Sequence, residues 1–152
     1  SADALARALD AGAIGIAAQV VGSLDRVLEL TSDYLHTRKQ FGQPLSNFQA
    51  LQQMMADMFV NTEMARSSLH ASLASVGRSD AERQAAVSSA RVRCDRAGLA
   101  VADLGIYLHG GMGMTMEYPV GHHYRRMVQL VRTFGDSEYH LSRYENLAFA
   151  DD

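Results

Sequence analysis

The fold is decided by the segment from residue 48 to residue 69, FQALQQMMADMFVNTEMARSSL. Its apolar and small residues recur at spacings of three and four over about six turns, which is the period of a helix with one buried face. These positions are Phe48, Leu51, Met55, Met58, Thr62, Ala65 and Leu69. Ser46, followed three residues later by Gln49, predicts a capping box at the start of this helix, and residues 77–78 predict its end.

Similar patterns flank this helix on both sides. A first long helix is predicted over residues 5–36, with one apolar face made by Val20, Leu24, Val27, Thr31 and Leu35. A third long helix is predicted to begin at the capping box of Ser79 and Glu82 and to end at His109 and Gly110. Its stripe consists of Val87, Ala90, Cys94, Ala97, Val101, Leu104 and Leu108.

Two shorter helices complete the predicted fold. Pro119 suits the first position of a helix over residues 120–132, and Asp136 or Ser137 caps a last helix to about Phe149. No strong strand pattern, repeat or domain boundary interrupts the chain. The sequence therefore predicts one all-α domain over residues 1–152, an antiparallel helical bundle with three long and two shorter helices.

Composition excludes several classes of protein. The chain has 152 residues, of which 47% are hydrophobic, so it is long enough for one core and is not disordered. Acidic and basic residues are interspersed with a net charge of −3, which does not fit a nucleic-acid surface. A single cysteine, Cys94, excludes an intramolecular disulfide. We see no apolar run long enough to span a membrane and no basic leader, and we expect a cytoplasmic protein.

Two loops carry residues that suit a ligand. Arg38 and Gln40, at a helix end, offer a planar cation and an amide to a diphosphate or an adenine edge, although helix capping alone also explains a basic residue there. The loop GGMG, residues 110–113, lets the backbone come close to a ligand, and a helix cap followed by a turn is the alternative. It fails as a dinucleotide fingerprint because it follows a helix rather than a strand.

Together these motifs resemble the C-terminal helical domain of the acyl-CoA dehydrogenases. The resemblance rests on Tyr34, then RKQFG at residues 38–42 and Pro44, and on a following helix with Gln49 and the triplet ADM at residues 56–58. The loop GGMG followed by TMEYPV continues it to residue 120. The resemblance implies an FAD-dependent oxidoreductase that dehydrogenates an acyl-CoA between its α and β carbons. It also implies an N-terminal helical domain and a middle β domain, which these residues do not include.

The resemblance assigns two sets of residues to cofactor binding. We expect four of them to contact FAD across a subunit interface, and these are Arg38, Gln40, Phe41 and Gln49. We expect Gly110 and Gly111 to bring the loop backbone close to the cofactor. Tyr107 stands where the family has a glutamine, so an amide contact is lost there. The candidate cofactor-binding residues are Arg38, Gln40, Phe41, Gln49, Tyr107, Gly110, Gly111, Asp136 and Glu138.

The family's catalytic glutamate is replaced. The family segment Tyr-Glu-Gly-Thr aligns with residues 133–136, and Phe134 takes the place of the glutamate that abstracts the α-proton. A phenyl ring cannot accept a proton. Some members take this glutamate from the first helix, at a position that falls near Gly12. We therefore expect no catalytic residue in this chain.

A finer resemblance suggests why the base is missing. Phe134-Gly135-Asp136 with His140 and Arg143 is similar to the small, non-base subunits of bacterial heteromeric acyl-CoA dehydrogenases, such as the small subunit of pimeloyl-CoA dehydrogenase. That similarity implies a homo- or hetero-oligomer with another acyl-CoA dehydrogenase subunit, which would supply the glutamate. It implies an electron-transfer partner without identifying it.

Two other functions stay open. The domain could be catalytic with Asp136 or Glu138 as the base, although both carboxylates also suit the start of the last helix. It could instead be a helical scaffold without flavin, which Tyr107 favours. No metal site is expected, since the adjacent His122 and His123 diverge on a helix.

Overall fold

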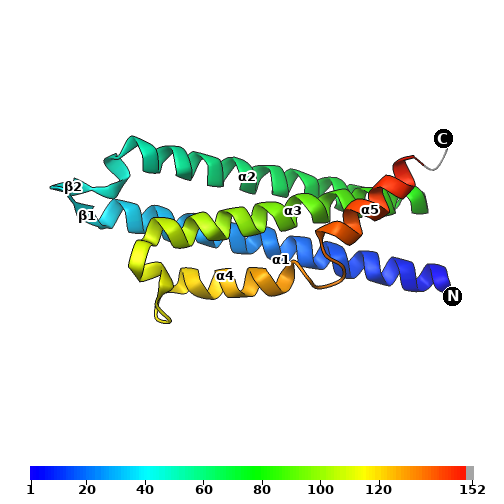
Figure 1. Cartoon of the computed structure of the whole chain (residues 1–152). Helices are drawn as coiled ribbons and strands as arrows, with labels where there is room; N and C mark the ends of the chain where they lie inside the picture. Colours follow the sequence, from blue (N-terminus) through cyan, green and yellow to red (C-terminus); the bar gives the residue numbers. More distant parts are fainter. Residues whose placement is uncertain (150–152) are drawn as a thin grey trace.

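Five α-helices and a short hairpin form residues 1–149, which are the residues that this computed structural model describes (Figure 1). The three long helices are α1 (Ala2–Thr37), α2 (Gln49–Ala74) and α3 (Asp80–His109). The two shorter ones are α4 (Pro119–Leu130) and α5 (Ser137–Ala148). The predicted all-α bundle of three long and two shorter helices is confirmed.

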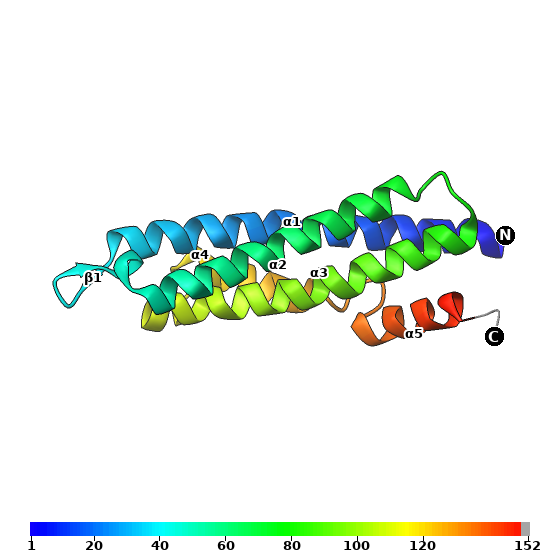
Figure 2. The ribbon, with the colours of Figure 1, turned by 90° about the horizontal axis from the view of Figure 1, so that it is seen from above.

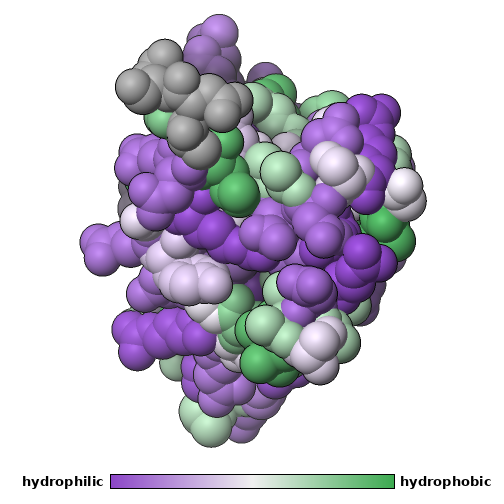
Figure 3. Space-filling view, turned by 90° about the vertical axis from the view of Figure 1, so that its right-hand side faces the viewer, coloured by the Kyte–Doolittle hydropathy of each residue, from purple (hydrophilic) through white to green (hydrophobic). Residues whose placement is uncertain are grey.

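Successive helices from α1 to α4 alternate in direction along one long axis, so α1 and α3, which pack against each other, run the same way (Figure 1). Figures 1 and 2 show α1, α2 and α3 side by side, with α4 against α1 and α3, and α5 across the outer side of α3. The start of α1 and the end of α5 lie at the same end of the bundle, opposite the hairpin (Figure 1), and Figure 3 looks onto this end. The antiparallel order of α1 to α4 follows from their connections, which bring each of these helices back along its predecessor, whereas α5 continues in the direction of α4 and packs on α3.

The core is built from the predicted apolar stripes. All five stripe residues of the first helix are buried, as are Met58, Ala65 and Leu69 in α2 and Val101 in α3. A buried hydroxyl in these stripes bonds to the backbone one turn earlier. Thr31 Oγ1, for example, donates to the carbonyl oxygen of Val27 at 2.7 Å. Burial of such groups therefore leaves no unpaired hydroxyl at this position.

Gly105 marks the closest approach of α3 to its neighbours, and it supports a first prediction. A Cβ added there would lie 2.8 Å from Val27 Cγ1 and 3.2 Å from Val120 Cγ2, and both valines are stiff at χ1. We expect Gly105→Ala to lower the free energy of unfolding by about 1–3 kcal/mol through overpacking. At Gly22 a Cβ meets nothing within 4 Å, so Gly22→Ala should raise it by about 0.5–1 kcal/mol. Urea unfolding measures both, and equal stability of the two variants would contradict the packing argument.

The connection between α1 and α2 differs from the sequence prediction. Strands β1 (Lys39–Gln40) and β2 (Gln43–Pro44) pair antiparallel, and a 3-10 turn, η1 (Leu45–Asn47), follows them. The predicted capping box of Ser46 and Gln49 is wrong, since Phe48 holds the N-cap position without a side-chain bond. Ser46 lies inside η1, two residues before this N-cap. The second predicted box, Ser79 with Glu82, is formed.

The expectation that no apolar run is long enough to span a membrane is wrong for α1. This helix contains an 18-residue window of mean hydropathy 1.4, so by length and composition it is the one helix among the described residues that could cross a membrane. Its most apolar side chains, from Ala13 to Leu35, instead make up the α1 side of the bundle core. The core helix of a folded domain can satisfy the same criterion as a membrane span, and 33% of this window is buried inside the bundle.

Candidate functional site

The hairpin after α1 forms a projecting tip at one end of the bundle (Figure 1). Arg38 ends α1, and its carbonyl oxygen accepts a hydrogen bond from the Leu45 amide at 2.9 Å, which closes the base of the hairpin. Phe41 and Gly42 form the two-residue turn with φ angles of 54° and 77°. Positive φ at both positions is the requirement of a type I′ turn, and it is costly for a phenylalanine. Phe41 is 90% exposed, and its ring lies edge to face with that of Phe48 at a centroid distance of 6.1 Å.

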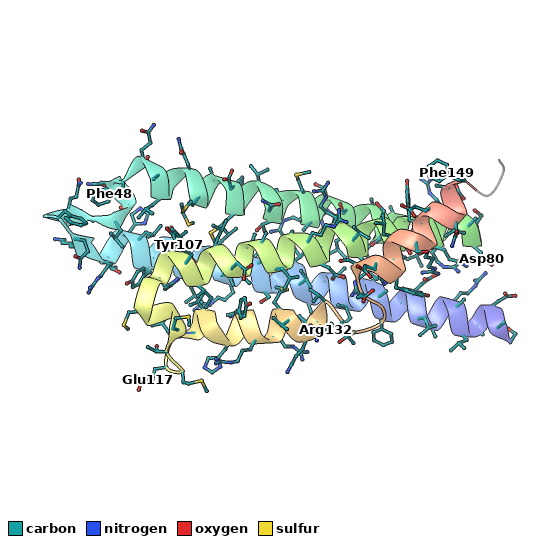
Figure 4. The ribbon with its side chains drawn as sticks, in the orientation of Figure 1. Phe48, Asp80, Tyr107, Glu117, Arg132 and Phe149 are labelled. Atoms are coloured by element: carbon teal, nitrogen blue, oxygen red, sulfur yellow. The ribbon has the colours of Figure 1, made fainter. Side chains whose placement is uncertain are left out.

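The glycine loop lies at the same end. Gly110 caps α3 with φ +57° and begins a 3-10 turn, η2 (Gly110–Met114). Gly110 and Gly111 are exposed, and a Cβ on either would meet nothing within 4 Å, so their backbone is open to a ligand. Figure 4 shows Tyr107 at this end of α3, on the same end of the bundle as Phe48. Tyr107 is 66% exposed and lines a cavity of about 710 Å³ together with Gly110 and Arg125.

A buried aromatic cluster fixes the end of α3 below this loop. His109 is buried, and its Nδ1–H donates to the carbonyl oxygen of Gly105 at 2.7 Å. Its ring stacks on Tyr34 at 4.6 Å between centroids and lies 5.0 Å from the ring of Tyr118. Burial lowers the pKa of His109, so the imidazole is neutral near pH 7. The residue before the glycines is therefore a rigid anchor rather than a mobile group.

The structure divides the nine predicted residues into two groups. Seven lie at the hairpin end, and Asp136 and Glu138 lie at the start of α5. The segment before α5 contacts α1 at Gly12, which is 26 residues before Arg38. At 1.5 Å per residue this places the two groups about 40 Å apart along α1. Asp136 is the N-cap of α5, because its Oδ1 accepts from the Tyr139 amide at 2.9 Å, and Glu138 is exposed in the first turn.

Phe134 and Gly12 lie directly against each other. A Cβ added to Gly12 would be 2.8 Å from Cε1 and Cζ of the Phe134 ring, so the ring occupies the space that the glycine leaves. Phe134 has φ +58° and its ring is about half exposed. The two positions that the resemblance predicts for a glutamate therefore lie in contact, and the phenyl ring fills the space between them.

A buried arginine on α3 holds the segment that carries Phe134. Arg91 is fully buried, and its Nη1 and Nη2 donate to the carbonyl oxygens of Thr133 at 2.9 Å and Gly135 at 3.0 Å. Its Nε and Nη2 also bond the carboxylate of Asp95, at 3.3 and 3.1 Å. Burial raises the pKa of Asp95 to about 6, while the Arg91 guanidinium opposes this rise. Sequence reasoning missed Arg91, although an Arg–Asp pair at i and i+4 beside Cys94 on the apolar stripe was a usable signal.

A second buried ion cluster lies under the same segment. Asp10 is buried on α1, and its carboxylate contacts Arg83 Nε at 3.0 Å and Arg143 Nη1 at 2.7 Å. His140 Nε2–H donates to the carbonyl oxygen of Phe134 at 3.0 Å, so its Nδ1 accepts from the Ser88 hydroxyl at 3.2 Å. Asp10 is the carboxylate nearest in sequence to Gly12, and two arginines neutralise it.

The buried imidazole of His140 makes stability depend on pH. Burial, with Arg91 nearby, lowers the pKa of His140 to about 4, against 6.5 for an ordinary histidine. As the pH falls, the unfolded chain therefore takes up a proton at His140 before the folded chain does. The contribution of neutral His140 to the free energy of unfolding is complete above pH 6.5. As the pH falls towards 4, about 3 kcal/mol of that free energy is lost.

Urea unfolding of the wild type and of His140→Gln at pH 7 and pH 5 isolates this effect. The raised pKa of Asp95 acts in the opposite direction, because its contribution is present at low pH and is lost as the pH rises to about 6. That contribution is common to both proteins and cancels in their difference. We expect the stability advantage of the wild type at pH 7 to shrink at pH 5, and an unchanged difference would rule out His140 as the source.

Comparisons with known proteins identify the family of this chain. Residues 2–145 match the family described as acyl-CoA dehydrogenase, C-terminal domain. The chain is 32% identical over 140 residues to acyl-CoA dehydrogenase IpdE2 of Mycolicibacterium smegmatis, which covers 92% of this chain and 43% of the relative. The chain thus spans less than half the length of the curated relatives that it matches.

Solved structures show the same architecture. Butyryl-CoA dehydrogenase from Megasphaera elsdenii has a TM-score of 0.88 and 28% identity, over 94% of this chain and 37% of that one. A glutaryl-CoA dehydrogenase from Mycobacterium smegmatis, solved in complex with FADH2, has a TM-score of 0.84 and 25% identity over the same shares of both chains.

Proposed function

The chain belongs to the acyl-CoA dehydrogenase family, and we propose that it forms the C-terminal helical domain of an FAD-dependent enzyme that lacks a catalytic base of its own. Family members are oxidoreductases that use FAD. The proposed reaction of the whole protein is the α,β-dehydrogenation of an acyl-CoA thioester, in which FAD, when bound, accepts the β-hydride. An N-terminal helical domain and a middle β domain would complete the acyl pocket beside residues 1–152.

The hairpin end fits an anionic cofactor with flat rings. Arg38 offers a planar cation, Phe41 offers an exposed aromatic face, and Gly110 and Gly111 offer backbone amides that no side chain covers. With Gln40 and Gln49, and with Tyr107 as an aromatic face in place of the family's amide, these residues would hold the flavin nucleotide of a partner subunit. Because Asp136 and Glu138 lie about 40 Å away along α1, we expect them to contact the flavin of a different subunit.

One observation carries the proposal that the base is missing: the Phe134 ring fills the space above Gly12. Neither position at which relatives carry the glutamate offers a proton acceptor here. Asp10 is paired with two arginines, and Asp136 caps α5. A partner subunit with its own glutamate would supply the base, which favours a hetero-oligomer over a self-sufficient enzyme.

The absorbance spectrum of the purified protein tests this function. The full-length protein that contains this domain is purified alone and again after co-expression with an acyl-CoA dehydrogenase subunit that carries the glutamate. We expect bound flavin and acyl-CoA oxidation only in the co-purified complex. Flavin and turnover in the full-length protein alone would contradict the proposal, because they would require a base within it.

Replacing Arg38 tests the cofactor contact itself. In the complex, Arg38→Ala should weaken FAD binding about tenfold or more, because a charge-assisted bond to a phosphate is lost. The matched control is Arg132→Ala, which removes an exposed arginine two residues after the end of α4 (Figure 4). Flavin fluorescence after dilution measures the retained fraction. Equal retention by both variants would favour the scaffold function over flavin binding.

A further inference from the structure

Three of the eight methionines of the chain lie within residues 112–116, here called the methionine loop. They are Met112, Met114 and Met116, and they are 46%, 77% and 70% exposed. Met58 and Met127, in contrast, are fully buried in the bundle core. Thioethers that are open to solvent are therefore concentrated in the segment that directly follows the two exposed glycines of the candidate cofactor site.

The backbone of the methionine loop is held in place, which sets the position of its side chains. Gly113 is buried against the end of α3, where an added Cβ would lie 2.7 Å from the carbonyl oxygen of Ile106. The amide and the hydroxyl of Thr115 both donate to the carbonyl oxygen of Met112, at 3.2 and 2.9 Å. Met114 lies between these two anchors. A chemical change at its side chain would therefore alter a surface of the loop rather than the fold of the loop.

Met114 shares a cavity with two of the candidate cofactor contacts. The cavity of about 710 Å³ that Tyr107 and Gly110 line is also lined by Met114, and its walls include the side chains of Ile106 and Tyr124. A thioether suits such walls, because its sulfur is polarisable and makes favourable contacts with aromatic rings. A flavin nucleotide held beside Tyr107 and Gly110 would thus have the Met114 side chain as a neighbour.

We infer that Met114 is an oxidation site, and that its oxidation weakens the binding of the flavin nucleotide at this end of the bundle. The oxidant is hydrogen peroxide, which forms when a reduced flavin reacts with molecular oxygen. The inference rests on the proposed function, because that function places a flavin beside this loop. It adds a means by which oxidative conditions regulate the same site.

The oxidation is a two-electron transfer of one oxygen atom to sulfur. The thioether sulfur attacks one oxygen of the peroxide, an S–O bond forms and the O–O bond breaks. The proton of the transferred oxygen passes to the departing hydroxide, which leaves as water. The sulfur is oxidised by two electrons and the peroxide is reduced by two. Methionine sulfoxide reductases reverse the change, so the modification is suited to regulation.

The sulfoxide is poorly suited to the place that the thioether occupies. Oxidation turns a flexible apolar side chain into a polar one, and burial of a polar group under a ligand without a hydrogen bond opposes binding. Met112 and Met116 are also exposed but lie outside the lining of this cavity. We therefore expect all three methionines to be oxidised, and the effect on flavin binding to come from Met114.

Peroxide treatment of the full-length protein, in complex with the glutamate-bearing subunit, tests the inference. We expect mass spectrometry to find the sulfoxide at Met114 and none at the buried Met58 and Met127. Flavin fluorescence after dilution should show that the dissociation constant of FAD rises about fivefold or more. Treatment with a methionine sulfoxide reductase and a dithiol should restore the original value.

Three variants of the same complex assign the effect to one sulfur atom. Met114→Leu keeps an apolar side chain without sulfur, so its FAD dissociation constant should be the same before and after peroxide. Met114→Gln carries a polar group and should bind FAD more weakly than the wild type without any peroxide. Met64→Leu is the matched control, because it removes an exposed thioether from α2, and peroxide should weaken its flavin binding as in the wild type.

The outcomes separate this inference from the function on which it rests. A complex that holds no flavin before treatment would overturn both. A flavin-bound complex in which Met114 resists oxidation, or keeps its flavin once oxidised, would overturn the inference and leave the proposed function intact. Equal weakening of Met114→Leu by peroxide, or unchanged binding by Met114→Gln, would likewise overturn it, because the sulfur of Met114 would not be the cause.

Discussion

The Phe134→Glu variant is expected to give this domain a working base. In the flavin-bound complex, with the partner's own glutamate replaced by glutamine, we expect it to raise the exchange rate of the substrate α-proton by about 10²–10⁴. The rate is measured as deuterium incorporation at the α-carbon of an acyl-CoA in heavy water. Phe134→Gln, which has the same length without a basic group, is the control and should show no gain.

The structure gives the reasons for this expectation. Arg91 donates to the carbonyl oxygens of Thr133 and Gly135, and His140 donates to the carbonyl oxygen of Phe134 itself. Because these bonds fix the backbone, a new side chain at residue 134 would leave it in the same direction. Gly12 leaves open the space that the ring now fills. Glutamate is unbranched at Cβ, as phenylalanine is, and so it tolerates the positive φ as well. If the wild-type domain already exchanges the proton, and Asp136→Asn with Glu138→Gln abolishes that exchange, another base operates and this explanation is wrong.

The Arg91→Met variant is expected to lose about 3–5 kcal/mol of stability, which is a large part of the total for a domain of this size. Removal of the guanidinium leaves the buried carboxylate of Asp95 unpaired and two backbone carbonyls, at Thr133 and Gly135, without a donor. Urea unfolding at pH 7 measures the loss.

Two further variants separate the causes of that loss. Arg96→Met removes an exposed arginine from the same helix and should change stability by less than about 0.5 kcal/mol. Arg91→Met combined with Asp95→Asn should recover part of the loss, because it removes the uncompensated charge. A loss below about 1 kcal/mol in Arg91→Met alone would show that the ion pair and the two backbone bonds are not a stabilising unit.

The long helices could be predicted because each of them buries one stripe of residues against the others. A stripe such as Val20 to Leu35 is local information, and periodicity reports it directly. The Ser79–Glu82 box was found for the same reason, since both of its bonds form within one turn. The Ser46–Gln49 box failed because the hairpin shifts the start of α2, and two-residue strands are too short to show an alternating pattern.

The charged part of the site could not be predicted in this way. Asp10 meets Arg83 and Arg143 from three different helices, and this pairing depends on how the helices pack rather than on their period. The resemblance predicts Phe134 at the position of the family's glutamate, and counting back along the first helix predicts Gly12 as the other position. Only the packing of α1 against the segment before α5 reveals that these two positions touch.

The length of α1 has a consequence for how the domain works in an assembly. One unbroken helix of 36 residues carries Gly12 near one end and leads to Arg38 at the other. The length of this helix therefore sets the spacing between the two groups of candidate cofactor contacts. Each residue inserted between them would lengthen the helix by about 1.5 Å and rotate one group relative to the other by about 100°. The number of residues in this helix is thus as much a part of the site as the residues at its two ends.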